Sequence, residues 1–412
     1  MSLGTAFAQF LNVIFSPLIT RIYSPNEMGI FFLYTSILNI LLISASLKYE
    51  YSIPIAKNKI ISINTIALSI LILFITSILS TLILLILQEQ ILGLFNAEKL
   101  GNLVFLIPVG LLLAGLYTIL LQWALRTKNF KKISITKLFQ GLGQNLSQIV
   151  LGLIKFGSAG LIIGQVIGKC AGSLTLFRKL LSDDPRLLKN ISLRKIRWVF
   201  KRYRHFPLLT LPSQLLSRGG LELPVFFLTS IFSTAVVGQY GLANLIVNIP
   251  VVLIGTAIGD VFYAEAAANG KSDPKSLLKL SNQLVRKLVL LGIAPTLILI
   301  VFSPILFSFF FGEEWYDAGV FSQILAFLAF FRLVFTPVSR VFLVFEKHSI
   351  ALFTNVLRVL FVLVSFGATY YFNLNAFYAV SVYAVAMSIV YLMTYIFARR
   401  IILKQIENVS NP

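Results

Sequence analysis

The sequence has few charged residues for its length. Only 12% of its 412 residues are Asp, Glu, Lys or Arg, whereas soluble domains carry roughly 25%. Hydrophobic residues make up 58% of the chain, and apolar runs of about 20 residues, the length that crosses hydrocarbon, recur from end to end. This composition excludes a single water-soluble domain and indicates a protein that crosses a membrane many times.

Cysteine and histidine are also scarce. The only cysteine, Cys170, lies in an apolar stretch, so no intrachain disulfide can form. The two histidines, His205 and His348, belong to no cluster with metal-ligand spacing. Residues 164–170 (GQVIGKC) depart from an ATP-binding loop in spacing and lack its Ser or Thr. We therefore expect no cofactor and no metal, and no direct use of ATP.

The apolar runs predict twelve transmembrane spans. We place them at approximately residues 3–22, 28–47, 61–87, 103–124, 133–154, 157–176, 207–231, 241–264, 288–310, 318–344, 350–372 and 376–398. Lys and Arg gather in the loops that follow even-numbered spans, and the odd loops are nearly empty of them. By the positive-inside rule both termini are cytoplasmic. The net charge of +20 is thus explained by topology, and we expect no nucleic-acid partner.

A basic segment near the middle divides the chain. We expect an N-terminal six-helix lobe at 1–176, a basic cytoplasmic linker at 177–206, a C-terminal six-helix lobe at 207–398 and a cytoplasmic tail at 399–412. A weak internal repeat supports this division, because the Ser and Gly of 23–31 (YSPNEMGIF) recur in register in 232–240 (FSTAVVGQY). Six spans separate the copies, so the two lobes would be related by an axis along the membrane normal.

Three arginines fall inside predicted spans. Arg218 and Arg332 lie near the middle of their spans, and Arg358 lies about a third of the way in. Facing lipid, the three would together cost on the order of 8 to 10 kcal/mol, so we expect them to face protein, water or ligand. Glu222 lies four residues after Arg218 and could pair with it within the helix. Arg332 and Arg358 have no acid at such a spacing.

This excess of buried cations favours an anionic substrate. The planar guanidinium group donates two parallel hydrogen bonds to phosphate and is never deprotonated, which suits a pyrophosphate diester. Lys137, Lys169 and Arg340 lie nearer the cytoplasmic edge, where long side chains reach the interface. Neutral polar residues such as Gln140, Gln144 and Gln148 recur at helical spacing. They indicate either a wet enclosed surface or hydrogen bonds between helices.

Motifs along most of the chain resemble one family. They lie at 4–9 (GTAFAQ), 16–25 (SPLITRIYSP), 48–54 (KYEYSIP), 206–213 (FPLLTLPS), 311–319 (FGEEWYDAG) and 337–342 (PVSRVF). Their order and spacing are similar to those of Wzx-type polysaccharide flippases of the MOP (multidrug, oligosaccharidyl-lipid, polysaccharide) superfamily. By motif, Arg21 and Arg340 are the cations that this resemblance carries over. The chain differs from the family in beginning almost directly on its first span, so we expect either an upstream start or insertion directed by later loops.

The resemblance implies an all-α bundle of twelve helices in two lobes around a central cavity, working by alternating access. Its cargo would be an undecaprenyl-pyrophosphate-linked oligosaccharide, the repeat unit of an O-antigen, capsule or exopolysaccharide. The protein would carry it from the cytoplasmic to the periplasmic leaflet of the bacterial inner membrane. Membrane lipids and the polysaccharide polymerase machinery are the expected partners, and Asp260 and Glu222 are the candidates for coupling to a proton or sodium gradient.

Three other functions compete with a flippase. An ion-coupled multidrug or cation exporter of the same superfamily should have an acidic cavity, whereas the central charges here are mostly Arg. A major-facilitator transporter should carry a glycine–acid–arginine signature between its second and third spans, and residues 48–60 lack it. A polymerase or glycosyltransferase needs an acid and a base, for which the external loops are too short. We therefore expect a transporter and not an enzyme.

Overall fold

The computed structural model describes residues 2–94, 98–183, 185–270 and 273–410, and within them it contains helices and no strand. The chain divides into two compact units, Met1–Gly238 and Gln239–Pro412. The all-α class predicted from the sequence is confirmed. The lobe boundaries placed on either side of 177–206 stay a prediction.

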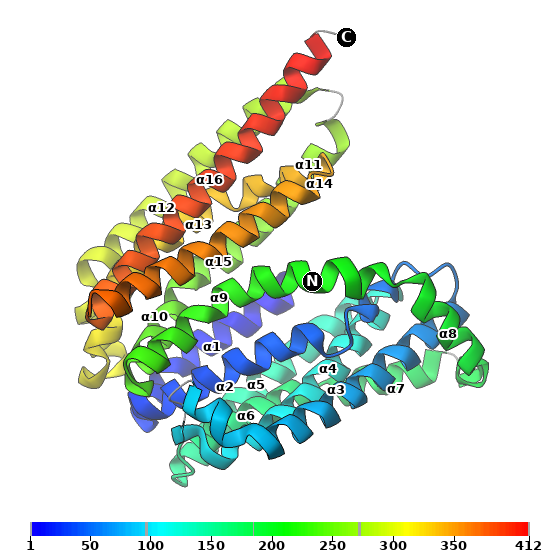
Figure 1. Ribbon diagram of the computed structural model, residues 1–412, viewed down its shortest axis with the longest axis horizontal. Helices are drawn as coiled ribbons and strands as arrows, with labels where there is room; N and C mark the ends of the chain where they lie inside the picture. The colour runs from blue at the N-terminus through cyan, green and yellow to red at the C-terminus, as the bar shows by residue number, and fades with distance from the viewer. Residues whose placement is uncertain (1, 95–97, 184, 271–272, 411–412) are drawn as a thin grey trace. The chain divides into compact units, whose positions relative to one another are not determined.

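In its described residues the first unit holds nine complete helices, which Figure 1 labels α1 to α9. In chain order they are α1 (Ser2–Ile22), α2 (Pro25–Ser44), α3 (Lys59–Leu94), α4 (Leu106–Arg126), α5 (Phe130–Leu153), α6 (Ser158–Cys170), α7 (Ser173–Asp183), α8 (Leu193–Arg202) and α9 (Leu211–Ile231). Short helical segments connect them: η1 (Tyr49–Ser52), η2 (Glu98–Phe105), η3 (Pro185–Asn190) and η4 (Phe206–Thr210). Among these helices α5 packs against α6 and α1, α3 packs against α4, and α9 packs against α2.

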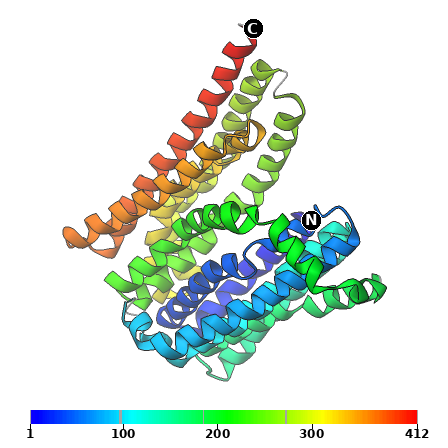
Figure 2. The ribbon, with the colours of Figure 1, turned by 45° about the vertical axis from the view of Figure 1, so that its right-hand side comes forward.

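The second unit contains six further helical elements and most of α10 (Thr234–Pro250), which starts before the boundary. They are α11 (Thr256–Asn269), α12 (Pro274–Phe311), α13 (Tyr316–Phe335), α14 (Val341–Val344), α15 (His348–Tyr371) and α16 (Ala376–Ser410), joined by η5 (Val251–Gly255), η6 (Glu313–Trp315) and η7 (Pro337–Arg340). The core of this unit forms where α13 packs between α12 and α16, and α15 covers α16 (Figure 2).

Nine helical segments in the described residues are long and apolar enough to cross a membrane. Three more long helices, α1, α5 and α9, have 21, 24 and 21 residues. Together with the nine segments they lie at the twelve predicted positions. Helices α5 and α9 carry the polar side chains described below, and these lower their apolar character. The polar residues therefore lie in helices that neighbouring helices must cover.

Glycines let α5 and α6 approach closely. A Cβ atom on Gly164 would lie 2.5 Å from the Gln148 side chain, and one on Gly168 would lie 2.5 Å from that of Gln144. Larger residues would force the helices apart, so the spacing of Gly160, Gly164 and Gly168 serves helix packing, as small residues at four-residue spacing do in membranes. This agrees with the absence of a phosphate-binding loop in the sequence.

The 48–54 motif forms a buried polar turn between α2 and α3. Lys48 has a left-handed φ of 64°, and its Nζ atom lies 3.7 Å from Glu50 Oε1. Glu50 is 1% exposed and also accepts a hydrogen bond from Ser46. Removal from water lowers the pKa of Lys48, and the Glu50 carboxylate partly offsets this.

Arg126 of α4 binds the same turn. It donates hydrogen bonds to the carbonyls of Ile53, Pro54 and Ala56 at 3.0, 3.0 and 2.8 Å.

Helix α8 is docked on this turn. Its inner residues Val199 and Tyr203 join a buried cluster with Tyr49, Leu68 and Ile72. The Tyr49 hydroxyl donates to the Phe200 carbonyl at 3.0 Å, and the same burial raises the pKa of Tyr49. The basic segment that joins the sixth and seventh predicted spans is therefore a packed element of the first unit.

Candidate functional site

Arg358 lies on the covered face of α15. Thr354, Val362, Ser365 and Thr369, at helical spacing on either side of it, are buried, while Leu352, Leu360 and Val364 of the same helix are exposed. Its guanidinium carbon lies 5.5 Å from the centre of the Tyr391 ring on α16, a cation–π contact. Nη1 donates a long hydrogen bond of 3.4 Å to Asn355, and the buried Nε has no hydrogen-bond partner.

Arg332 lies on α13 and is bound to a polar residue of α10. Its Nη1 donates to Asn248 Oδ1 at 2.9 Å. Asn248 in turn donates to the Asn244 carbonyl at 2.7 Å, one turn earlier. The bond between Arg332 and Asn248 joins residues 84 positions apart and has no local signal in the sequence.

One buried tyrosine lies near both arginines. Tyr383 of α16 is 4% exposed and lies within electrostatic range of both Arg332 and Arg358. In the described part of the chain, neither arginine has a carboxylate within ion-pair distance; the ion pairs present join other residues. The structure thus brings two of the predicted arginines into one region of the second unit, without an acid to neutralise them.

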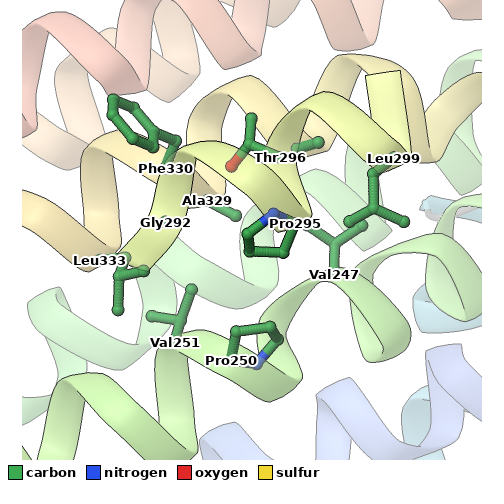
Figure 3. A pocket seen from close by; sticks show the side chains of 11 residues that line it. Val247, Pro250, Val251, Gly292, Pro295, Thr296, Leu299, Ala329, Phe330 and Leu333 are labelled. Atoms are coloured by element: carbon green, nitrogen blue, oxygen red, sulfur yellow. The ribbon is translucent and has the colours of Figure 1, made fainter. Parts of the chain in front are cut away.

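An apolar pocket lies among α10, η5, α12 and α13 of this unit. Pro250, Pro295 and Phe330 are among the residues that line it, and its cavity volume is about 20 Å³ (Figure 3), little more than one water molecule needs. Its lining residues Val247 and Leu333 are sequence neighbours of Asn248 and Arg332. Apart from the Thr296 hydroxyl the lining is apolar, so it suits contact with a hydrocarbon group better than with a sugar.

In the first unit, Arg218 pairs with Glu222 as the spacing predicted. Arg218 Nε lies 3.2 Å from Glu222 Oε1, with the arginine side chain 53% exposed and the glutamate 13% exposed. Glu222 also accepts hydrogen bonds from Ser36 at 2.8 Å and Asn39 at 3.1 Å, both on α2. The carboxylate therefore ties α9 to α2 and holds Arg218.

Two lysines lie near Arg218, and both are predicted to lie near the membrane edge. Lys169 of α6 lies within electrostatic range of both Lys137 and Arg218, and Lys137 lies 5.2 Å from the centre of the Tyr117 ring. Lys137, Lys169 and Arg218 form a group of three cations from three helices, which we call the first-unit cations. The signal that could have found them is the polar stripe of α5, which begins at Lys137 and continues at Gln140.

The remaining candidates occupy other places. Arg340 of η7 pairs with Asp260 of α11 at 3.2 Å, with side chains 39% and 72% exposed. Arg21 lies exposed in the last turn of α1. Within the described ranges no group of His, Cys, Asp and Glu could hold a metal ion. The candidates are therefore distributed over both units.

Solved structures with a similar fold are membrane transporters. A multidrug resistance MATE family transporter of the MOP superfamily, in an inward-facing conformation, has 15% identity and a TM-score of 0.74 over 97% of this chain and 96% of its own. The lipid II flippase MurJ, in an inward closed conformation, has 15% identity and a TM-score of 0.75 over 96% and 86%. A MOP superfamily transporter from Pyrococcus furiosus has 14% identity and a TM-score of 0.61 over 98% and 95%.

These similarities define the class: the chain is a multi-pass membrane protein with the fold of the MOP transporters. No curated protein sequence matches it. The sequence profile of the family described as "Polysaccharide biosynthesis protein" matches residues 18–320, about three quarters of the chain. The chain belongs to that family.

Proposed function

We propose that this protein is a flippase for an undecaprenyl-pyrophosphate-linked oligosaccharide. In this proposal it moves the repeat unit of an O-antigen, capsule or exopolysaccharide from the cytoplasmic to the periplasmic leaflet of the bacterial inner membrane. Membership of a polysaccharide biosynthesis family and a fold shared with a lipid II flippase support the general class. The half-buried arginines Arg332 and Arg358 support an anionic cargo.

The proposal depends most on the unsatisfied environment of Arg358. Its Nε proton is buried without an acceptor, its Nη1 hydrogen bond is long, and no acid neutralises its charge in the described part of the chain. A guanidinium group in membrane costs several kcal/mol unless protein, water or ligand solvates it. A pyrophosphate would supply both the acceptor atoms and the opposite charge.

Arg332 would add a second donor group to the same phosphates. It shares Tyr383 with Arg358, and its hydrogen bond to the neutral Asn248 orients the guanidinium without cancelling its charge. The apolar pocket lined by Val247 and Leu333 offers hydrocarbon contacts close in sequence to both polar residues. Cationic and apolar groups on the same helices suit a cargo that is itself part phosphate and part isoprenoid.

The first-unit cations would by themselves also attract an anionic cargo. In the described part of the chain Lys137 and Lys169 have no acid within ion-pair distance, whereas Arg218 has Glu222. The group therefore keeps a net positive charge, which favours an anion. Arg21 and Arg340 are included in the proposal on the family motif, and Arg340 already has Asp260 as a partner. Coupling to a proton or sodium gradient through Asp260 or Glu222, and contact with the polysaccharide polymerase machinery, stay predictions.

The test is transport in proteoliposomes of purified protein with a fluorescent undecaprenyl-pyrophosphate-linked sugar, read by chemical quenching of the outer leaflet. We expect Arg358→Ala and Arg332→Ala each to lower the flipping rate at least tenfold. Arg358→Lys should recover only part of it, because an ammonium lacks the planar fork. Arg399→Ala removes an exposed arginine of α16 and should leave the rate unchanged.

The same vesicles separate the flippase from an exporter. A cationic dye replaces the lipid as cargo in a second measurement, with a proton or sodium gradient imposed. We expect no gradient-driven dye export above protein-free vesicles. Export of the dye by wild type, with flipping unaffected by Arg358→Ala, would overturn the proposal in favour of a multidrug or cation exporter.

A further inference from the structure

The outer face of α8 is basic and aromatic, and no acidic residue lies near it in sequence. Its exposed residues Leu193, Arg194, Arg197, Trp198, Lys201 and Arg202 recur three and four positions apart and so share one side of the helix. Leu193 is 84% exposed and Trp198 is 49% exposed. Between Pro185 and His205 the sequence has eight Lys or Arg and no Asp or Glu. We call these six residues the α8 outer face.

The opposite side of α8 is packed against the first unit, and this packing fixes the direction in which the α8 outer face points. Val199 and Tyr203 are buried against Tyr49, Leu68 and Ile72, and Ser192 caps the helix by accepting from the Lys195 backbone amide at 3.4 Å. Asn64 of α3 holds the preceding turn, because it donates to the Asn190 carbonyl at 3.2 Å and accepts from the Ser192 amide at 3.1 Å. The α8 outer face is therefore presented by a rigid support.

The chain also holds α8 close to a bilayer surface. Helix α8 ends at Arg202, and the next predicted span, 207–231, begins five residues later. Five residues reach at most about 18 Å, so the C-terminal end of α8 stays within that distance of the start of the predicted span. Leu208 and Leu209, which are 66% and 71% exposed, are the first exposed apolar residues after the connection between α8 and this span.

We propose that the α8 outer face binds the anionic headgroups of the surrounding lipid bilayer. Basic side chains beside Trp and Leu on one side of a short helix are typical of helices that lie in the interface, and each Lys or Arg near an anionic surface adds to the attraction. A lipid surface is favoured over a soluble acidic protein because the connection to α9 keeps this face within reach of headgroups at all times. The proposal is independent of the cargo and of the direction of transport.

Trp198 gives a direct test, since the other two tryptophans, Trp123 and Trp315, are each 1% exposed. Full-length protein is placed in nanodiscs that contain lipids brominated near the headgroup, either neutral phosphatidylcholine alone or with phosphatidylglycerol. The signal of Trp198 is the emission of wild type minus that of Trp198→Phe. We expect at least twofold more quenching of this signal in anionic than in neutral nanodiscs, and loss of the difference in about 1 M salt, where screening is nearly complete.

The charge requirement is tested with matched variants. Arg194→Gln/Arg197→Gln/Lys201→Gln removes three cations from the α8 outer face and should abolish the difference between the two lipids. Lys275→Gln/Lys279→Gln/Arg286→Gln removes three exposed cations of α12 and should retain it. Blue-shifted emission of Trp123 and Trp315 reports folding in every sample.

Three outcomes would overturn the proposal. One is equal quenching in both lipids at every salt concentration, which would show apolar insertion without headgroup binding. Another is no quenching in either lipid, which would place the face in water. The third combines two results: polyglutamate protects Trp198 from a water-soluble quencher in neutral nanodiscs, and anionic lipid has no effect on Trp198. That outcome would identify an acidic protein as the partner.

Discussion

Gly29 packs directly against the backbone of the segment that contains Gly238, and Gly238 packs directly against the backbone of the segment that contains Gly29. A Cβ atom on Gly29 would be 1.7 Å from the Thr234 carbonyl oxygen, and one on Gly238 would be 1.9 Å from the Pro25 carbonyl oxygen. These are the equivalent glycines of the weak internal repeat, so the two copies of the repeat contact each other reciprocally. Asn26 and Thr234 add a short side-chain hydrogen bond to the same contact.

The first prediction concerns this contact. Gly29→Ala and Gly238→Ala should each destabilise the protein by about 2 kcal/mol or more, because a backbone carbonyl cannot move aside as a side chain can. The measurement is the apparent melting temperature in detergent, followed by tryptophan emission.

Two glycines elsewhere serve as controls for this contact. A Cβ on Gly219 or on Gly367 would meet nothing within 4 Å, so Gly219→Ala and Gly367→Ala should melt at or slightly above the wild-type temperature. Equal melting of all four variants would contradict the close approach of α2 and α10.

The second prediction concerns the buried pair of Lys48 and Glu50. Lys48→Met leaves the Glu50 carboxylate buried with Ser46 as its remaining polar partner, and loss of one member of a buried pair typically costs about 3 to 5 kcal/mol. The double variant Lys48→Met/Glu50→Gln removes both charges and should recover much of that loss. The free-energy difference is measured by denaturant unfolding in mixed micelles. A double variant no more stable than Lys48→Met would show that the pair is not the source of the effect.

The third prediction is a pH dependence at Tyr23, between α1 and α2. Burial, and then the charge of Glu27, raise the pKa of Tyr23 from 10.0 to about 12, and its hydroxyl donates to the Gln148 carbonyl at 2.7 Å. Because the folded pKa is above the unfolded one, the stabilisation is complete below about pH 10 and is lost as the pH rises toward 12.

Melting temperatures across this range check the Tyr23 prediction. Wild type should lose stability between about pH 10 and 12 more steeply than Tyr23→Phe, which lacks the titrating hydroxyl. Tyr378→Phe, a change at a side chain that is 63% exposed, should follow wild type. Parallel curves for wild type and Tyr23→Phe would show that Tyr23 titrates alike in both states.

Features that depend on local spacing could be predicted from the sequence. The long apolar runs, the alternation of basic loops and the pairing of Arg218 with Glu222 at four-residue spacing all follow from properties of single helices. The family motifs predicted the MOP fold, which the structural comparisons confirm.

Contacts between distant segments could not be predicted in this way. Arg126 reaches carbonyls some 70 residues earlier, Arg332 bonds to Asn248, and Lys169 joins Arg218 from another helix. Helical periodicity shows which face a residue occupies but not which helix that face meets. The position of Lys137 and Lys169 near the membrane edge stays a prediction.

The central claim is that Arg332 and Arg358 bind the pyrophosphate of a lipid-linked sugar. The most direct measurement is the dissociation constant of undecaprenyl pyrophosphate for purified wild type, Arg332→Ala, Arg358→Ala and Arg399→Ala, by native mass spectrometry. Loss of one charged hydrogen-bond donor costs about 1.5 to 3 kcal/mol, so each of the first two variants should bind roughly tenfold or more weakly than wild type and Arg399→Ala. Equal affinity in all four proteins would contradict the account.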